Sequence, residues 1–287
     1  MMQTELARDI SYASSARSAA GRAVIRLLEN ATGRMALIRR AAGYEQDMQA
    51  GRAFWDVIPE RYGLTLEVAV GSLAAIPRTG PLVLIANHPY GILDGLMMAQ
   101  ILHRSRADFR ILANAVFTRA TPLNDVVLPI SFDETPGALR LNLDTRAAAL
   151  RYLGQGGAIG VFPGGTVSTA ARPFSQPLDP VWRGFTAKMI ARSGAKVVPV
   201  FFEGQNSRLF QIASHLHSNL RLGLLLKEFK ARTDAPVRVR IGAPLDAADL
   251  PRDPAAMMET LRRATYALSP AASKSYGLGY EFEARYR

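Results

Sequence analysis

The sequence predicts an α/β fold in which a mixed, largely parallel sheet is flanked by helices and preceded by an N-terminal helical appendage. Short runs of β-branched and aliphatic residues alternate with longer segments of helical periodicity, which is typical of a sheet whose strands are joined by helices. The 287 residues, of which 48% are hydrophobic and 21% charged, are ordinary for a globular chain with one large domain.

Seven short apolar runs are expected to be strands, since each is bounded by turn or polar residues. They span 65–70, 82–86, 109–113, 126–131, 158–162, 197–202 and 237–241. Helical periodicity predicts helices over 94–104, 138–153, 183–193, 207–228 (with room for a break) and 254–268. The last helix has the clearest start, because Asp253-Pro254 supplies an N-cap and a proline at the first helical position.

Residues 17–43 have the pattern of an amphipathic basic helix, with a kink or break expected at Gly33. Six arginines oppose one glutamate there, and the apolar positions are Val24, Leu27, Leu28, Met35, Leu37 and Ile38. A cationic helix with an apolar stripe favours a position in a membrane interface. A second helix is expected near 45–60, where packing against the following domain is the alternative to membrane contact. Its apolar residues are Phe54, Trp55, Val57 and Ile58.

The composition excludes several kinds of site. Without cysteine the chain forms no disulfide, no thiolate metal site and no cysteine nucleophile. We find no secretory signal and no run of about 18 apolar residues, so no ordinary transmembrane helix is expected and a cytoplasmic location is predicted. Three regions are expected: an amphipathic helical region at 1–62, the α/β domain at 63–270 and a C-terminal tail at 271–287.

The net charge of +11 points to an anionic partner. Between Arg172 and Arg240, twelve basic residues stand against four acidic ones. An anionic membrane surface attracts such a face by about 1 kcal/mol per nearby Lys or Arg, and an acidic protein is steered by the same field. A solvated basic face without a partner is the alternative. Nucleic acid is not expected, since the sequence shows no zinc spacing, no aromatic β-platform motif and no clear helix-turn-helix pattern.

The most informative stretch is 82–95. Its apolar strand stops just before His88, Tyr90-Gly91 turns the chain, and Asp94 opens a helical pattern. An imidazole has a reference pKa of about 6.5, and a carboxylate on its other nitrogen fixes the tautomer and stabilises the imidazolium. The spacing therefore favours an oriented general base. A surface histidine with Asp94 as a helix cap is the alternative.

A glycine-rich loop follows the strand expected at 158–162. In Phe162-Pro163-Gly164-Gly165-Thr166, two glycines remove side chains where the backbone must approach a ligand closely or adopt a positive φ. Their N–H groups are suited to hold a phosphate or carboxylate or to stabilise an oxyanion, and a tight strand-exit turn is the alternative. Sites in such sheets lie beyond the carboxyl ends of strands, where His88 and Gly164 both fall.

Several other sequence patterns argue against particular kinds of functional site. The glycines at 154–160 precede a strand instead of following one into a helix, so they do not form a dinucleotide-binding turn. No serine occupies a G-x-S-x-G elbow. His103 is expected at a helix end or on the surface. His215 and His217 would face different sides of a helix with no carboxylate near them, so no metal site is predicted.

Three segments, in the right order and each at a strand end, resemble motifs of the glycerolipid acyltransferases, the lysophosphatidate acyltransferase superfamily. Asn87-His88 with Asp94 resembles the first motif, the run 162–168 resembles the third, and Val198-Pro199-Val200 resembles the fourth. The resemblance covers roughly 65–245.

The chain also departs from the pattern of that superfamily. Five residues separate His88 from Asp94 where four are usual, and Gly164 stands in place of the glutamate of the third motif. The best match to the second motif, 126–132, runs into Asp133-Glu134 instead of ending in an arginine. The missing glutamate of the third motif and the missing arginine of the second weaken the case for a phosphate-bearing glycerol acceptor.

The five-residue spacing and three further segments look most like the bacterial haemolysin-like branch of the superfamily. The segments are Val167-Ser168, Trp182-x-Gly184-Phe185 and Glu203-Gly204-Gln205-Asn206-Ser207. Several members of that branch make aminolipids such as ornithine or glycine lipids. The resemblance therefore implies a lyso-aminolipid acceptor such as lyso-ornithine lipid. Lysophosphatidate is the alternative acceptor, and a catalytically inactive membrane-binding module is the alternative from another class.

The resemblance implies a membrane-associated O-acyltransferase, peripheral on the cytoplasmic face of the inner membrane. Its donor would be a fatty acyl thioester of acyl carrier protein or coenzyme A, a co-substrate and not a bound cofactor. His88 would act as general base, oriented by Asp94. The expected substrate contacts are Asn87, Tyr90, Gly91, Phe162, Pro163, Gly164, Gly165, Thr166 and Ser168.

Overall fold

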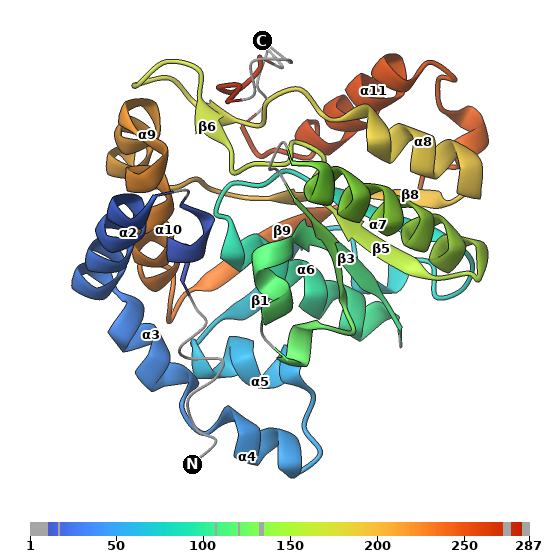
Figure 1. Cartoon of the computed structure of the whole chain (residues 1–287). Helices are drawn as coiled ribbons and strands as arrows, with labels where there is room; N and C mark the ends of the chain where they lie inside the picture. The colour runs from blue at the N-terminus through green and yellow to red at the C-terminus, as the bar shows by residue number, and fades with distance from the viewer. Residues whose placement is uncertain are drawn as a thin grey trace.

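A computed structural model describes residues 11–282 except 17, 107, 120, 132–134 and 272–276. Its centre is a seven-stranded sheet with helices on both faces (Figure 1). The strands, in sheet order, are β1 (Thr65–Val70), β9 (Pro236–Ile241), β8 (Lys196–Phe202), β2 (Leu82–Ala86), β5 (Ala158–Val161), β3 (Arg110–Asn114) and β4 (Val127–Ile130). Among the described strands of this sheet, β8 and β9 alone are antiparallel neighbours, which confirms the expected mixed, largely parallel sheet.

The helices after β2 lie close to their predicted positions. They are α6 (Ile92–Ser105), α7 (Pro136–Gly154), α8 (Gly184–Ser193), α9 (Arg208–Leu216), α10 (Ser218–Lys230) and α11 (Pro254–Tyr266). The helix expected over 207–228 is broken at His217, which is extended and whose Nδ1 accepts the N–H of Asn219 at 3.0 Å as the cap of α10. Short 3₁₀ turns are η1 (Ala13–Ser15), η2 (Leu73–Ala75), η3 (Ala115–Arg119), η4 (Thr121–Leu123) and η5 (Ala247–Asp249).

Two short strands were not expected from the sequence. β6 (Thr169–Ala170) and β7 (Pro177–Leu178) form an antiparallel hairpin after the glycine-rich loop. Residues 277–282 of the expected tail run beside it, where the N–H of Gly279 donates to the carbonyl of Asp179 at 2.9 Å and that of Tyr280 to Thr169 at 3.0 Å. This part of the tail therefore packs on the domain.

The N-terminal region consists of α2 (Ala19–Thr32), α3 (Arg34–Ala41), α4 (Tyr44–Gln49) and α5 (Phe54–Arg61). The break expected at Gly33 is confirmed, because this residue ends α2 and precedes α3. The single helix predicted near 45–60 is wrong. Residues 50–53 separate α4 from α5, with Gly51 at φ 85°, a conformation that interrupts a helix and suits glycine.

These N-terminal helices share the core of the sheet. Leu37 and Val57 belong to the same buried cluster as Leu84 and Phe202, so the expected boundary at residue 62 does not separate two cores. α2 packs along α10, and Ile25 is fully buried there. Because of this packing, one apolar side of α2 is already covered by protein.

Each face of the sheet carries its own apolar core. Leu82 and Leu84 of β2 pack with α5, α6 and α10, whereas Val83 and Ile85 pack on the other face with α7, α8 and α11. All five residues of β2 are buried, which explains why its sequence is an uninterrupted apolar run. No helix of the described residues is both long and apolar enough to cross a bilayer.

The topology brings the two main motifs together. β2 and β5 are parallel neighbours, so the chain leaves both at the same edge of the sheet. The segment after β2 begins with Asn87-His88 and the segment after β5 begins with Phe162. The carboxyl ends of these two central strands therefore form the floor of a common site.

We predict that Ile25→Ala lowers the free energy of unfolding by about 2–5 kcal/mol, because this fully buried side chain joins α2 to the domain. Leu27→Ala on the same helix is the matched control, since Leu27 is 71% exposed and its loss should change stability by less than about 0.5 kcal/mol. Urea unfolding of the two variants measures the difference. Equal, small effects would contradict the packing of α2 as part of the fold.

Candidate active site

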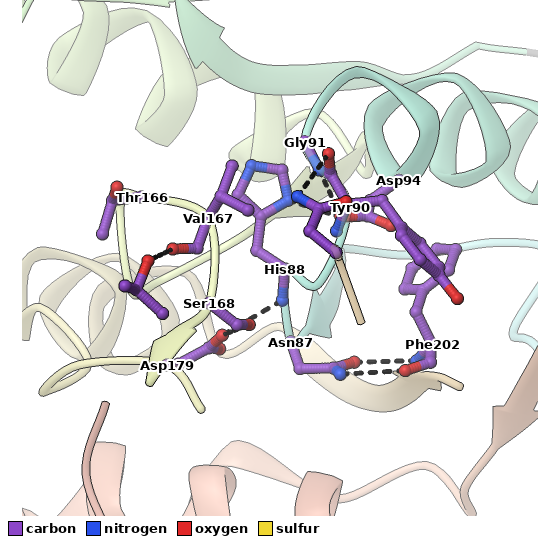
Figure 2. Close-up of polar contacts among 12 residues, drawn as sticks. Asn87, His88, Tyr90, Gly91, Asp94, Thr166, Val167, Ser168, Asp179 and Phe202 are labelled. Atoms are coloured by element: carbon purple, nitrogen blue, oxygen red, sulfur yellow. Dashed lines mark hydrogen bonds and ion pairs between the residues drawn. The ribbon is translucent and has the colours of Figure 1, made fainter. Parts of the chain in front are cut away.

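His88 and Asp94 form a hydrogen-bonded pair at the start of α6. His88 Nδ1 lies 2.9 Å from Asp94 Oδ2, and the carboxylate is fully buried. The same oxygen accepts the backbone N–H groups of Tyr90 at 2.7 Å and Gly91 at 2.9 Å (Figure 2). A carboxylate beside Nδ1 favours the tautomer in which Nδ1 carries the proton and Nε2 keeps its lone pair. This is the tautomer that a general base requires.

The turn between the two residues explains how a five-residue spacing is accommodated. Gly91 has φ 97°, a backbone conformation that other residues rarely adopt, and it is the N-cap of α6. A Cβ added there would also lie 3.2 Å from Leu225 and from Val167. The glycine lets the chain fold back over Asp94, so that the longer turn still gives a short His–Asp contact.

The glycine-rich loop encloses His88. The Phe162 ring stacks on the imidazole with centroids 4.3 Å apart and planes 23° apart. At the other end of the loop, the N–H of Ser168 donates to the carbonyl of His88 at 2.8 Å. Between them, the N–H of Gly165 closes a turn onto the carbonyl of Phe162 at 3.0 Å, with Gly165 at φ 68°. The loop and the histidine are therefore held as one unit.

Asp179 is a second buried carboxylate at this site, and the sequence analysis did not single it out. Its Oδ1 accepts the N–H of His88 at 3.2 Å and the hydroxyl of Ser168, and its Oδ2 accepts the indole N–H of Trp182 at 2.9 Å. Burial raises the pKa of Asp179, and these donors act in the opposite direction. Asp179 thus fixes the backbone of His88, while Asp94 fixes its ring.

A cavity of about 1540 Å³ opens beside His88. Apolar side chains from several helices and strands line most of it, among them Trp55, Leu96, Ile111, Leu150, Leu225 and Phe229. Charged side chains line it too, with five basic residues outnumbering three acidic ones: Arg146, Arg183, Lys188, Arg192 and Arg221 against Asp253, Glu259 and Glu281. The combination suits a molecule with a long apolar chain and an anionic part.

Six of the predicted site residues line this cavity: His88, Gly91, Phe162, Pro163, Gly165 and Thr166. Four others, Asn87, Tyr90, Gly164 and Ser168, are not among its described lining residues. Asn87 instead links β2 to β8, because its amide nitrogen donates to the carbonyl of Phe202 at 3.0 Å and its oxygen accepts the N–H of Phe202 at 2.7 Å (Figure 2). In this structure the amide of Asn87 therefore positions the end of β2, and its predicted substrate contact stays a prediction.

The other three residues also contact protein, and their predicted substrate contacts stay predictions. The hydroxyl of Tyr90 donates to the carbonyl of Glu203 at 2.7 Å, which ties the His–Asp turn to the end of β8. Gly164 packs against the 179–180 segment, where a Cβ would lie 3.3 Å from Pro180. The Ser168 hydroxyl donates a hydrogen bond to Asp179. In this structure the polar groups of Asn87, Tyr90 and Ser168 bind protein atoms around the site.

Several residues named in the sequence analysis lie elsewhere. His103, in the last turn of α6, has Nε2 3.6 Å from Asp56, as expected for a helix-end histidine. His215 Nε2 lies 2.9 Å from the carbonyl of Ala170. Asp133-Glu134, at the end of the second-motif match, lie outside the described residues. Within the described part of the chain, no three His, Asp or Glu side chains are grouped as metal ligands.

Comparisons with known proteins identify a family for the chain. A family model described as acyltransferase matches residues 22–273, and no curated protein matches the chain significantly. Among solved structures, the chain is similar to the 1-acyl-sn-glycerophosphate (LPA) acyltransferase PlsC from Thermotoga maritima, with 17% identity, a TM-score of 0.44 and coverage of 75% of this chain and 79% of that one. Since the family model spans most of its length, the chain belongs to the acyltransferase family.

Proposed function

We propose that the protein is a membrane-associated O-acyltransferase that moves a fatty acyl group from an acyl thioester to a hydroxyl of a lyso-lipid. The observation that carries the proposal is the His88–Asp94 contact of 2.9 Å at the wall of a large, mainly apolar cavity. The pair supplies a base, and the cavity has room for an acyl chain. A catalytically inactive membrane-binding module would not need an oriented imidazole there.

In the proposed mechanism the acyl group passes directly between the substrates, without an acyl-enzyme. His88 Nε2 removes the proton of the acceptor hydroxyl as its oxygen attacks the thioester carbonyl. A carbon–oxygen bond forms, and the carbonyl oxygen becomes an oxyanion that backbone N–H groups or basic side chains near the 162–168 loop stabilise. When the intermediate collapses, the carbon–sulfur bond breaks and the thiolate takes the proton from the imidazolium. Asp94 stabilises that imidazolium throughout.

The proposed donor is acyl carrier protein or coenzyme A carrying a fatty acyl thioester. Both are anionic, and three exposed cations, Arg146, Lys188 and Arg192, line the cavity on α7 and α8. Such a basic rim favours the approach of an acidic protein or of a phosphate-bearing thiol. The donor enters and leaves as a co-substrate.

The proposed acceptor is a lyso-aminolipid such as lyso-ornithine lipid, in keeping with the haemolysin-like resemblance. Gly164 brings no carboxylate to the loop, in contrast to the usual third motif. Lysophosphatidate is the second candidate, which the basic side chains lining the cavity favour because they suit a phosphate as well as a carboxylate.

The proposed membrane contact is peripheral, on the cytoplasmic face of the inner membrane. α2 and α3 are buried on one side only, and on the other side Val24 is 41%, Leu27 71% and Met35 48% exposed. Arg22 and Arg39, on the same two helices, are also exposed. Exposed apolar side chains on a pair of helices that also exposes cations favour an anionic lipid surface.

We predict that purified protein, given an acyl thioester and a panel of lyso-lipids, acylates lyso-ornithine-type lipids with a higher kcat/KM than lysophosphatidate. Mass spectrometry of the diacylated products measures the ratio. A preference for lysophosphatidate would contradict the aminolipid proposal and leave the acyltransferase proposal in place. No transfer to any acceptor would contradict both.

We predict that His88→Ala lowers kcat by about 10²–10⁴-fold, which is the usual contribution of a general base. Asp94→Asn should lose less, because it disturbs the tautomer without removing the base. Initial rates with both carrier-protein and coenzyme A donors measure the losses. Circular dichroism checks that both variants fold, and a folded His88→Ala protein with most of its activity would rule out His88 as the base.

We predict that replacing Val24, Leu27 and Met35 together by glutamine reduces the part of vesicle binding that survives high salt, because salt screens exposed charges within about 8–10 Å but leaves apolar insertion. Co-sedimentation with phosphatidylglycerol vesicles at low and high salt measures it. Val70→Gln with Leu139→Gln is the control, since these residues are similarly exposed (43% and 62%) on β1 and α7. Unchanged binding of the triple variant would contradict a membrane contact through α2 and α3. It would favour the basic 172–240 segment as the membrane-binding surface.

A further inference from the structure

The outward side of α9 is apolar, although this helix lies at the surface of the molecule. Leu209, Ile212 and Leu216 are 52%, 36% and 70% exposed, and their spacing of three and four residues places them on one side of the helix. Phe210 and Ala213, on the other side, are buried. A surface helix ordinarily directs polar residues to solvent, so α9 has a second apolar side that the described part of the chain leaves exposed.

The loop between β6 and β7 adds an aromatic ring beside this helix. Phe174 in that loop is 78% exposed, and it lines the same small hollow as Arg208 and Gln211 of α9. A single exposed apolar side chain is ordinary, whereas several on neighbouring elements mark an interaction surface. We call Phe174, Leu209, Ile212 and Leu216 the α9 surface.

The α9 surface is next to α2 and α3, the helices of the proposed membrane contact. Figure 1 shows α9, α2 and α3 one after another along the left edge of the molecule. The contacts agree, because α9 packs on α10 and α10 packs on α2. A Cβ added to Gly21 of α2 would lie 2.6 Å from the side chain of Asn219, which is three residues after Leu216. The exposed apolar residues of α2 and α9 therefore belong to the same side of the molecule.

The charges on these segments are complementary to an anionic surface. Every exposed charged residue that the structure describes on α2, α3, α9 and the 171–176 loop is an arginine, namely Arg22, Arg39, Arg172 and Arg208. Glu29, the acidic residue of α2, is buried and accepts hydrogen bonds from Ser11 and Tyr12. Apolar side chains together with cations favour an anionic bilayer. A second copy of the chain would bring like charges together, which is unfavourable.

An acidic carrier protein fits a different part of the molecule. The exposed cations that line the cavity, Arg146, Lys188 and Arg192, belong to α7 and α8 on the right of Figure 1, whereas α9 lies on the left. In the α9 surface, four exposed apolar residues outnumber the two arginines of the same segments, Arg172 and Arg208. This ratio favours insertion into lipid over docking of an acidic protein.

The buried side of α9 connects this surface to the catalytic cavity. Phe210 packs in one apolar cluster with Val167 and Leu225, and both of these residues line the cavity. A bilayer at the outward side of α9 is therefore separated from the cavity wall by the thickness of one helix.

We propose that the α9 surface inserts into the lipid bilayer as a second membrane contact beside that of α2 and α3. Its four apolar side chains enter the membrane interface, and Arg172 and Arg208 meet the anionic headgroups. The inference rests on the proposed function and deepens it, because it states which side of the domain faces the membrane. The cations of α7 and α8 then face the aqueous side, from which the acyl donor arrives.

The absence of cysteine allows each contact to be measured at a single introduced thiol. Leu216→Cys and Phe174→Cys are labelled with the environment-sensitive fluorophore NBD and mixed with phosphatidylglycerol vesicles. Leu27→Cys reports on α2, and Leu139→Cys on α7 is the control; all four side chains are strongly exposed. The labels at 216 and 174 are expected to brighten, shift to the blue and be quenched by nitroxide lipids, whereas the label at 139 stays unchanged.

The contribution to affinity is measured with unlabelled variants. Leu209→Gln with Leu216→Gln is expected to weaken vesicle binding about tenfold, since two apolar side chains are lost from the membrane interface. Val70→Gln with Leu139→Gln is the matched control and should bind as wild type does. Co-sedimentation measures the affinities, and circular dichroism checks that both variants fold.

If the label at 27 responds to vesicles and those at 216 and 174 do not, the proposal is overturned and the α2–α3 contact stands. A response of the two labels without vesicles, to acyl carrier protein or to rising protein concentration, would also overturn it, because the partner would then be a protein. Insertion of both labels in a protein that acylates no lyso-lipid would support the α9 surface and contradict the proposed function, so the two failures are distinguishable.

Discussion

A single buried oxygen, Asp94 Oδ2, determines the geometry of the whole site. It accepts the imidazole N–H of His88 and the backbone N–H groups of Tyr90 and Gly91, so ring orientation and turn conformation depend on the same atom. The other oxygen of Asp94 is buried and accepts nothing from the described residues. The hydrogen bond to Asp94 fixes the imidazole ring at Nδ1 and leaves Nε2 open. A general base requires this arrangement, whereas a structural histidine does not. Asp179 also supports the site, because its Oδ1 accepts the backbone N–H of His88.

The sequence predicts the strands and most helices well because their burial is uniform along each element. β2 is buried on both faces and is therefore an uninterrupted apolar run, and the start of α11 carries a recognisable cap. The predictions were wrong where local propensity is weak. Two-residue strands such as β6 leave no periodicity to detect, and the turn at Gly51 divides a segment whose composition is helical throughout.

The roles of individual side chains were harder to predict, because they depend on partners far along the chain. Whether the amide of Asn87 faces substrate or protein is decided by Phe202, 115 residues later. Asp179 is 91 residues from the histidine whose backbone it holds, and Arg221 is 55 residues from Thr166. Motif resemblance located the loops correctly, but it could not separate the residues that line the cavity from those that support it. The three-dimensional contacts make that separation.

The pairing of β1 has a consequence for the order of folding. β1 pairs in parallel with β9 and with no other strand of the sheet, and Glu67 of β1 is joined to Arg238 of β9 across 171 residues of sequence. α2 likewise depends on α10. Until β9 and α10 have been synthesised, these early segments have no partner and expose apolar surface. Long-range pairing of this kind slows folding and makes incomplete chains prone to aggregation.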